Sequence, residues 1–142
     1  MIDDGFLDQF DDVIFYGCDA GGYATAAHSA SYPMATVIAI NPQATLNPSI
    51  ASWDKRFKHA RRQDFTTRFG YAPKMCKSAK NVFVFYDQES PENAMRAALF
   101  QGDNVTHLRS IVKSVDPAVF LGDAIFARDC GPDIGHPRNR VL

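Results

Sequence analysis

One short segment constrains the fold more than any other part of this chain. Residues 13–16 are apolar or aromatic, and this pattern indicates a buried strand. Glycines follow at Gly17, Gly21 and Gly22, and residues 23–30 are small and rich in alanine, which favours a helix. The segment therefore predicts a strand, a sharp turn and a helix, with the strand and the helix close together.

Residues 17–21, GCDAG, have the G-x-Nu-x-G spacing of a nucleophile elbow. The tip of such a turn is strained, and only small residues fit two positions to either side of it. The tip is usually serine, but here it is Asp19, which we assign to the nucleophile position. The helix that follows would direct N–H groups at the tip, and the N–H of Ala20 would serve an oxyanion hole. The close approach is assigned to three glycines: Gly17, Gly21 and Gly22.

Composition limits the class of protein. We expect one domain over residues 1–128 and an irregular tail over 129–142. The formal net charge of -1 provides no field that favours nucleic acid or an anionic membrane. The N-terminus lacks a signal pattern and no apolar run reaches transmembrane length, so a cytoplasmic protein is expected.

The three cysteines are far apart and form no C-x-x-C pair. They therefore indicate neither a zinc site nor a disulfide framework, and we expect no metal and no cofactor.

Further strands and helices alternate along the chain. Strands are expected at 36–40, 81–86 and 104–109, and helices at 21–31, 92–100 and 117–128. The strand at 36–40 contains a continuous apolar run, which is typical of burial on both faces of a parallel sheet covered by helices. The fold class is therefore α/β, with a mostly parallel sheet of about four strands flanked by helices.

Shorter features complete this pattern. Residues 6–10 indicate the end of a short helix, 70–73 a break and 75–80 a short helix or turn. The loop 41–48 leaves the second strand at the edge where open α/β sheets bind ligands. Ser90 and Pro91 suit the N-cap and the first position of a helix.

With these elements in place, the chain resembles the C-terminal half of an α/β-hydrolase, from residue 13 to about residue 127. More narrowly, it resembles uncharacterised bacterial domains with a Y-G-S-S-x-G-G-Y elbow, a PQ loop, a W-[DE]-x-R segment and a V-F-Y-D strand. The matching segments here are YGCDAGGY at 16–23, NPQ at 41–43, WDKR at 53–56 and VFYD at 84–87. The resemblance implies esterase-type hydrolysis of a small molecule, with Asp87 in the position of the catalytic acid.

The chain departs from that family at two positions. The family serine is Asp19, and the histidine expected soon after the last strand is absent from residues 110–116. Asp19 could attack carbon and form an ester intermediate. Alternatively, it could be a degraded site, or a polar residue satisfied by the N-terminus of the helix. Cys18 could be a displaced nucleophile, although its side chain should point away from the tip.

Four histidines are candidates for the general base. His28 lies in the first helix, His59 in a basic segment and His107 in the last strand, where structural roles are the alternative. We select His136, because the tail that carries it could fold back over the sheet edge.

The basic segment from residue 55 to residue 68 is either a solvated helix face or an anion clamp over the site. In the second case the anion-binding residues are three arginines: Arg56, Arg61 and Arg62.

Two other classes of function are open. The glycines could cradle a phosphate, but G-x-G-x-x-G and the Lys-Ser/Thr of a P-loop are absent. A catalytically inactive descendant, used for binding or assembly, is the main alternative to a hydrolase. In either case the first strand would form an exposed edge that a second copy or a larger partner covers.

Overall fold

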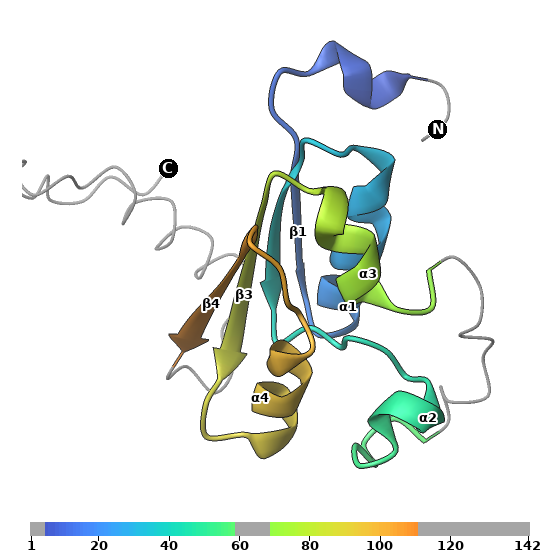
Figure 1. Ribbon diagram of the computed structural model, residues 1–142, viewed down its shortest axis with the longest axis vertical. Coiled ribbons are helices and arrows are strands. Elements are labelled where there is room, and N and C mark those ends of the chain that lie inside the picture. Colours follow the sequence, from blue (N-terminus) through green and yellow to red (C-terminus); the bar gives the residue numbers. More distant parts are fainter. Residues whose placement is uncertain (1–4, 59–68, 111–142) are drawn as a thin grey trace, which may run out of the picture.

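The computed structural model describes residues 5–58 and 69–110. Their centre is a four-stranded sheet in the order β1-β2-β3-β4, and every neighbouring pair is parallel (Figure 1). This confirms the predicted α/β class with a parallel sheet flanked by helices. The strands are β1 (Ile14–Cys18), β2 (Thr36–Ile40), β3 (Asn81–Asp87) and β4 (Val105–Ser110). The α-helices are α1 (Ala20–His28), α2 (Pro48–Ala51), α3 (Ala72–Met75) and α4 (Pro91–Ala98), and the 3-10 helices are η1 (Phe6–Gln9), η2 (Ser29–Ser31) and η4 (Cys76–Ser78).

Side chains alternate between the two faces of the sheet. We call one the helix-covered face, and its central residues are completely buried: Val37, Ala39, Val82 and Val84. The alternate positions form the second face, which carries large apolar side chains: Ile14, Tyr16, Ile38, Phe83, Phe85 and Leu108.

The core lies between the helix-covered face and helices α1, α3 and α4. Alanines contribute much of the helix surface there, and their small side chains let the helices approach the strands closely. They are Ala26, Ala27, Ala72 and Ala97. Phe100, just after α4, fills the remaining space and is fully buried.

The strand order explains why these three helices share one face. Each strand is added to the same side of the preceding one, and right-handed crossovers in a constant direction place every connecting helix on one side. Figure 1 shows α1, α3 and α4 on the same side of the strands. Among the described residues, the expectation of helices on both faces therefore holds for one face only. The predicted helix at 117–128 and the tail at 129–142 lie outside the described residues.

Several boundaries differ from the sequence prediction. β1 continues beyond residue 16, because Gly17 and Cys18 pair with Ala39 and Ile40. The loop after β2 contains a short helix, α2, which Asn47 caps by accepting a hydrogen bond from the N–H of Ser49. α3 begins within the predicted break at 70–73, because proline is tolerated in the first turn of a helix. Across the described ranges, no helix has the length and apolarity that crossing a bilayer requires.

Candidate functional site

Asp19 stands at the turn between β1 and α1 with φ 49° and ψ −114°. This conformation is costly for any residue with a side chain and is the kind of strain that concentrates at functional sites. Its backbone is held from two sides. The N–H donates to Ile40 O at 2.9 Å, and the carbonyl accepts from the N–H of Tyr23 at 3.1 Å. The predicted strand, sharp turn and helix are therefore present, with Asp19 at the turn.

Space requires a glycine at position 17 and is tight at position 22. A Cβ at Gly17 would lie 2.4 Å from Gly21 O, and one at Gly22 would lie 3.2 Å from the carbonyl oxygens of Gly17 and Ile40. A Cβ at Gly21 would meet no atom within 4 Å. The steric role assigned to Gly21 is therefore wrong: what the packing needs there is its backbone, which approaches Gly17.

The Asp19 side chain is exposed and makes no capping hydrogen bond to its own helix. This excludes the alternative in which the carboxylate caps α1, because an aspartate in that role accepts from an N–H two or three residues on. Ala20 is the first residue of α1, so its N–H is one of those that an α-helix leaves without an internal acceptor. The turn thus presents a carboxylate beside an oriented N–H donor.

The loop after β2 contacts the backbone of the Asp19 turn and the end of β3. The N–H of Gln43 approaches Asp19 O at 3.5 Å, and the Gln43 side chain is only 6% exposed. Asn41 has φ 45°, and its side-chain Oδ1 accepts from the N–H of Asp87 at 2.9 Å. Asn41 therefore links the exits of β2 and β3. Sequence reasoning missed this role, although asparagine is among the residues that adopt positive φ most readily.

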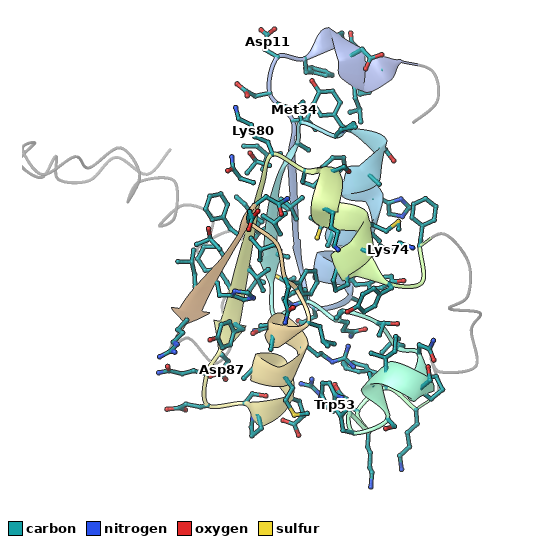
Figure 2. The ribbon with its side chains drawn as sticks, viewed as in Figure 1. Asp11, Met34, Trp53, Lys74, Lys80 and Asp87 are labelled. Atoms are coloured by element: carbon teal, nitrogen blue, oxygen red, sulfur yellow. The ribbon has the colours of Figure 1, made fainter. Side chains whose placement is uncertain are left out.

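Asp87 is the last residue of β3, at the edge where the strands end (Figure 2). The same view shows Trp53 near this edge, and Met34 and Lys80 at the opposite end of the strands. One oxygen of the Asp87 carboxylate already accepts from the N–H of Glu89 at 2.9 Å. This Asx turn shapes the β3–α4 loop, so Asp87 has a structural role besides any role as a catalytic acid.

The most extensive polar cluster at this edge centres on Asp54, whose side chain is fully buried. Arg96 Nε donates to Asp54 Oδ2 at 2.6 Å, and Arg96 Nη1 donates to Thr45 O at 3.1 Å. Arg56 donates from Nε and Nη2 to the two Asp54 oxygens at 3.0 and 2.8 Å, and from Nη1 to Asn93 Oδ1 at 3.0 Å. We call Asp54, Arg56 and Arg96 the arginine–aspartate cluster. It fastens the loop after β2 to α4.

Two aromatic rings pack against the Arg96 guanidinium of the cluster. The Arg96 guanidinium carbon lies 5.6 Å from the ring centroids of both Trp53 and Phe57, within the range of cation–π attraction. Burial alone would raise the pKa of Asp54. The hydrogen bonds from Arg56 and Arg96 and the charge of Arg96 outweigh burial and hold that pKa far below its ordinary value. Sequence reasoning noted the motif containing Asp54 but missed Arg96, since an arginine on a short helix normally faces solvent.

Arg56 is the described member of the predicted anion clamp. Its side chain is 39% exposed, and three of its five N–H groups are used within the cluster and by Asn93. Its pKa is raised, first by the hydrogen bonds to Asp54 and then by the charges of Asp54, Glu92 and Asp19. Arg56 therefore lies within electrostatic reach of the elbow carboxylate. Arg61 and Arg62 lie outside the described residues.

The two described histidines are engaged away from the elbow. His28 packs against the ring of Phe69 at 4.8 Å between centroids, and His107 Nε2 lies 2.9 Å from Ala97 O. His136, the selected base, and His59 lie outside the described residues.

Cys18 is the last residue of β1, directly before the turn. Its side chain is half-buried, with Sγ 3.9 Å from the hydroxyl of Tyr16 on the second face. Burial raises the pKa of this thiol, whereas cysteines that act as nucleophiles usually have a lowered pKa.

No cluster of His, Cys, Asp and Glu within residues 5–58 and 69–110 has the makings of a metal site. Comparisons of the chain with protein-family models, with curated proteins and with solved structures found no match.

Proposed function

We propose that this chain is an α/β-hydrolase-like domain that uses Asp19 as a carboxylate nucleophile in esterase-type or other carbon-attacking hydrolysis. The observation that carries the proposal is the backbone of Asp19. A positive φ with a strained ψ costs about 1–3 kcal/mol. Gly17 and Gly22 fit that turn, and the side chain is left exposed instead of capping α1.

The proposed chemistry has two steps. An Asp19 oxygen attacks an electrophilic carbon, and the leaving group departs with the bonding electron pair. Attack on an alkyl carbon gives an ester of Asp19, and attack on an ester gives an anhydride. Water then attacks the intermediate and regenerates the carboxylate. His136 is the proposed base for that water, Asp87 the proposed acid beside it, and the N–H of Ala20 the donor to the developing oxyanion.

Isotope labelling tests the nucleophile directly. The protein is incubated in H₂¹⁸O with chromogenic esters and with a small epoxide, and the elbow peptide is weighed by mass spectrometry. Turnover through a covalent intermediate introduces ¹⁸O into the Asp19 carboxylate. Asp19→Asn should abolish turnover, whereas Asp12→Asn, at an exposed carboxylate before β1, should leave it unchanged.

An Asp19→Ser variant completes the test. If the rest of the site is intact, this variant hydrolyses the chromogenic esters. The hydrolase proposal fails if neither the natural chain nor Asp19→Ser turns over any of these substrates.

A catalytically inactive binding module is the second candidate. The engagement of His28 and His107 away from the elbow favours it, as does the guanidinium of Arg56, which Asp54 and Asn93 hold in place. In this alternative, Asp19 and Arg56 contact a bound small molecule without reaction. Ligand-dependent shifts in melting temperature that are lost in Asp19→Ala, without turnover by any variant, would support it.

Arg56 is the proposed anion-binding residue in either case. Two of its N–H groups remain after the cluster and Asn93 are satisfied, which suits one carboxylate or phosphate group of a small molecule. Arg61 and Arg62 are proposed to act with it. The balanced charge of the chain favours such a ligand over nucleic acid, and we place the protein in the cytoplasm.

The first strand is the proposed place for a partner. Within the described sheet β1 is an edge, and Ile14 on it is 61% exposed. We propose that a second copy or a larger partner covers this edge. Light scattering should give a mass above that of one chain, and Ile14→Lys should reduce it to that of a monomer. A natural chain that stays monomeric at high concentration, with no partner recovered, would contradict this proposal.

A further inference from the structure

Gln43 is a polar residue that the fold buries without giving its side chain a hydrogen bond. It lies in the loop after β2 and is 6% exposed. Thr45, in the same loop, is also buried, but its hydroxyl donates to Gly70 O at 2.7 Å. Within the part of the chain that the structure describes, no group hydrogen-bonds to the Gln43 carboxamide. A polar side chain in such a position is unusual in a folded protein and calls for an explanation.

The Gln43 carboxamide reaches the surface at the end of an otherwise buried side chain. Across the described ranges, every side-chain nitrogen or oxygen that is shielded from solvent has a hydrogen-bond partner. Because the Gln43 amide has none, its nitrogen and its oxygen both keep some contact with solvent. Only 6% of the residue is exposed, so its stem is packed inside the protein while its polar end meets water.

The backbone contacts around Gln43 place it beside Asp19. Its N–H approaches Asp19 O at 3.5 Å, and the preceding Pro42 lies against the first turn of α1. On its other side, Ala44 O accepts from the N–H of Ala72, at the start of α3, at 3.0 Å. Of these four neighbours Asp19 is exposed and the others are buried. The amide therefore meets water beside the Asp19 carboxylate.

The loop that carries Gln43 is fixed before and after this residue. Asn41 donates from its N–H to Phe85 O at 2.7 Å, and its side chain accepts from the N–H of Asp87 at 2.9 Å. The bond from Thr45 fixes the loop on the far side of Gln43. A packed stem on a fixed loop loses little further freedom when a ligand binds, so the amide is preorganised for binding.

The polar groups around this point define the chemistry of a ligand. The Asp19 carboxylate only accepts hydrogen bonds and the N–H of Ala20 only donates, whereas the Gln43 carboxamide does both. A negatively charged ligand group would be repelled here by Asp19. An uncharged hydroxyl or carboxamide group, which donates and accepts, satisfies both ends of the Gln43 amide.

We propose that Gln43 is the specificity-determining contact of the Asp19 site, and that its carboxamide binds an uncharged hydroxyl or carboxamide group of the small molecule. This role of Gln43 rests on the proposed function only in that a small molecule must bind at Asp19. It holds equally for a hydrolase and for an inactive binding module. The anionic group assigned to Arg56 is then a separate part of the same molecule.

Nuclear magnetic resonance of the full-length ¹⁵N-labelled protein tests this role without requiring turnover. The side-chain NH₂ signals of Gln43 are assigned through their own backbone and followed while glycolamide is added. These signals should shift in a saturable manner. Gln101, whose exposed side chain already donates to Ala98 O, is the matched control, and its NH₂ signals should not move.

Glycolate, which replaces the amide of glycolamide by a carboxylate, tests the charge of the ligand. Its dissociation constant measured at Gln43 should be about tenfold higher, because its charge faces Asp19. The difference should shrink in Asp19→Asn. Three outcomes would overturn the proposal: no saturable shift at Gln43, equal shifts at Gln43 and Gln101, or tighter binding of glycolate than of glycolamide.

Turnover of esters gives a second measurement. The substrates are para-nitrophenyl glycolate and para-nitrophenyl acetate, which differ by a hydroxyl group. The ratio of their kcat/KM values should fall about tenfold in Gln43→Met, because this variant keeps the length of the side chain but loses the hydrogen bond to that hydroxyl. Gln101→Met should leave the ratio unchanged.

The two measurements separate the role of Gln43 from the hydrolase proposal. A saturable shift at Gln43, without turnover of either ester by the natural chain or by Asp19→Ser, supports the role of Gln43 and counts against the hydrolase. Turnover with an unchanged ratio in Gln43→Met, and no shift at Gln43, overturns the role of Gln43 and leaves the hydrolase standing.

Discussion

Asp19 keeps a backbone conformation that glycine would adopt at much lower cost. Two variants separate its carboxylate from its backbone strain, because Asp19→Ala and Asp19→Gly both remove the carboxylate but only glycine tolerates φ 49°. We expect Asp19→Gly to raise the free energy of unfolding by about 1 kcal/mol and Asp19→Ala to change it little. Urea denaturation of the three proteins measures this.

Asp19→Ala and Asp19→Gly also test whether Asp19 has a functional role. A stabilising substitution at a strained site that abolishes turnover or ligand binding is the expected mark of a functional residue. If Asp19→Gly is less stable than Asp19→Ala, the strain inferred from the backbone angles is absent in solution.

Gly17 and Gly21 are predicted to respond oppositely to alanine. A Cβ at position 17 would lie 2.4 Å from backbone, so α1 must move away from β1, and we expect a loss of roughly 3 kcal/mol or more. At position 21 there is open space, and alanine favours a helix over glycine by up to about 1 kcal/mol. Thermal and urea unfolding of the two variants are the measurements. Equal losses at the two positions would contradict the packing described here.

At the scale of elements, the arginine–aspartate cluster joins the loop after β2 to α4. Replacing Asp54 by alanine would leave the buried guanidinium of Arg96 without its carboxylate partner, which typically costs about 3–5 kcal/mol. We expect that loss in the free energy of unfolding at pH 7. Asp103→Ala, at an exposed carboxylate in the turn before β4, is the matched control and should change stability by less than about 0.5 kcal/mol.

The cluster also predicts a pH dependence. The pKa of Asp54 lies below its ordinary value of 3.8 in the folded protein, so its contribution is fully present above about pH 4 and is lost as the pH falls toward the folded-state pKa. The natural chain should therefore lose stability more steeply than Asp54→Asn between about pH 4 and pH 2. Urea unfolding at several pH values measures both slopes. Parallel slopes would show that Asp54 is not held ionised by the arginines.

The elements also show what the sequence could and could not predict. β2 was predicted at its observed bounds, because four apolar residues follow Thr36 and precede the loop that begins at Asn41. Ser90 caps α4 as expected. The Asp19 turn followed from its glycines, which is a local signal. Arg96 was missed because its burial depends on Asp54, 42 residues away. Only tertiary structure brings such residues together.

At the scale of the molecule, the sheet order predicts a gradient of local stability. β2 and β3 are hydrogen-bonded on both sides, whereas β1 and β4 are the edges of the described sheet. Backbone amides of Val37, Ala39, Val82 and Val84 should exchange most slowly with deuterium, and those of β1 faster. Hydrogen exchange followed by mass spectrometry or NMR measures the order. Protection of β1 equal to that of β2 would contradict a free edge and would support a bound partner there.

The packing around position 19 has a consequence for protein engineering. The turn is imposed by Gly17, Gly22 and the hydrogen bonds of the Asp19 backbone, so it does not depend on the side chain of residue 19. Serine, cysteine or histidine installed there would occupy the same place beside the first N–H of α1. The protein is thus a natural host for comparing different nucleophiles in one fixed geometry, and for measuring how much of a catalytic rate depends on the identity of the attacking atom.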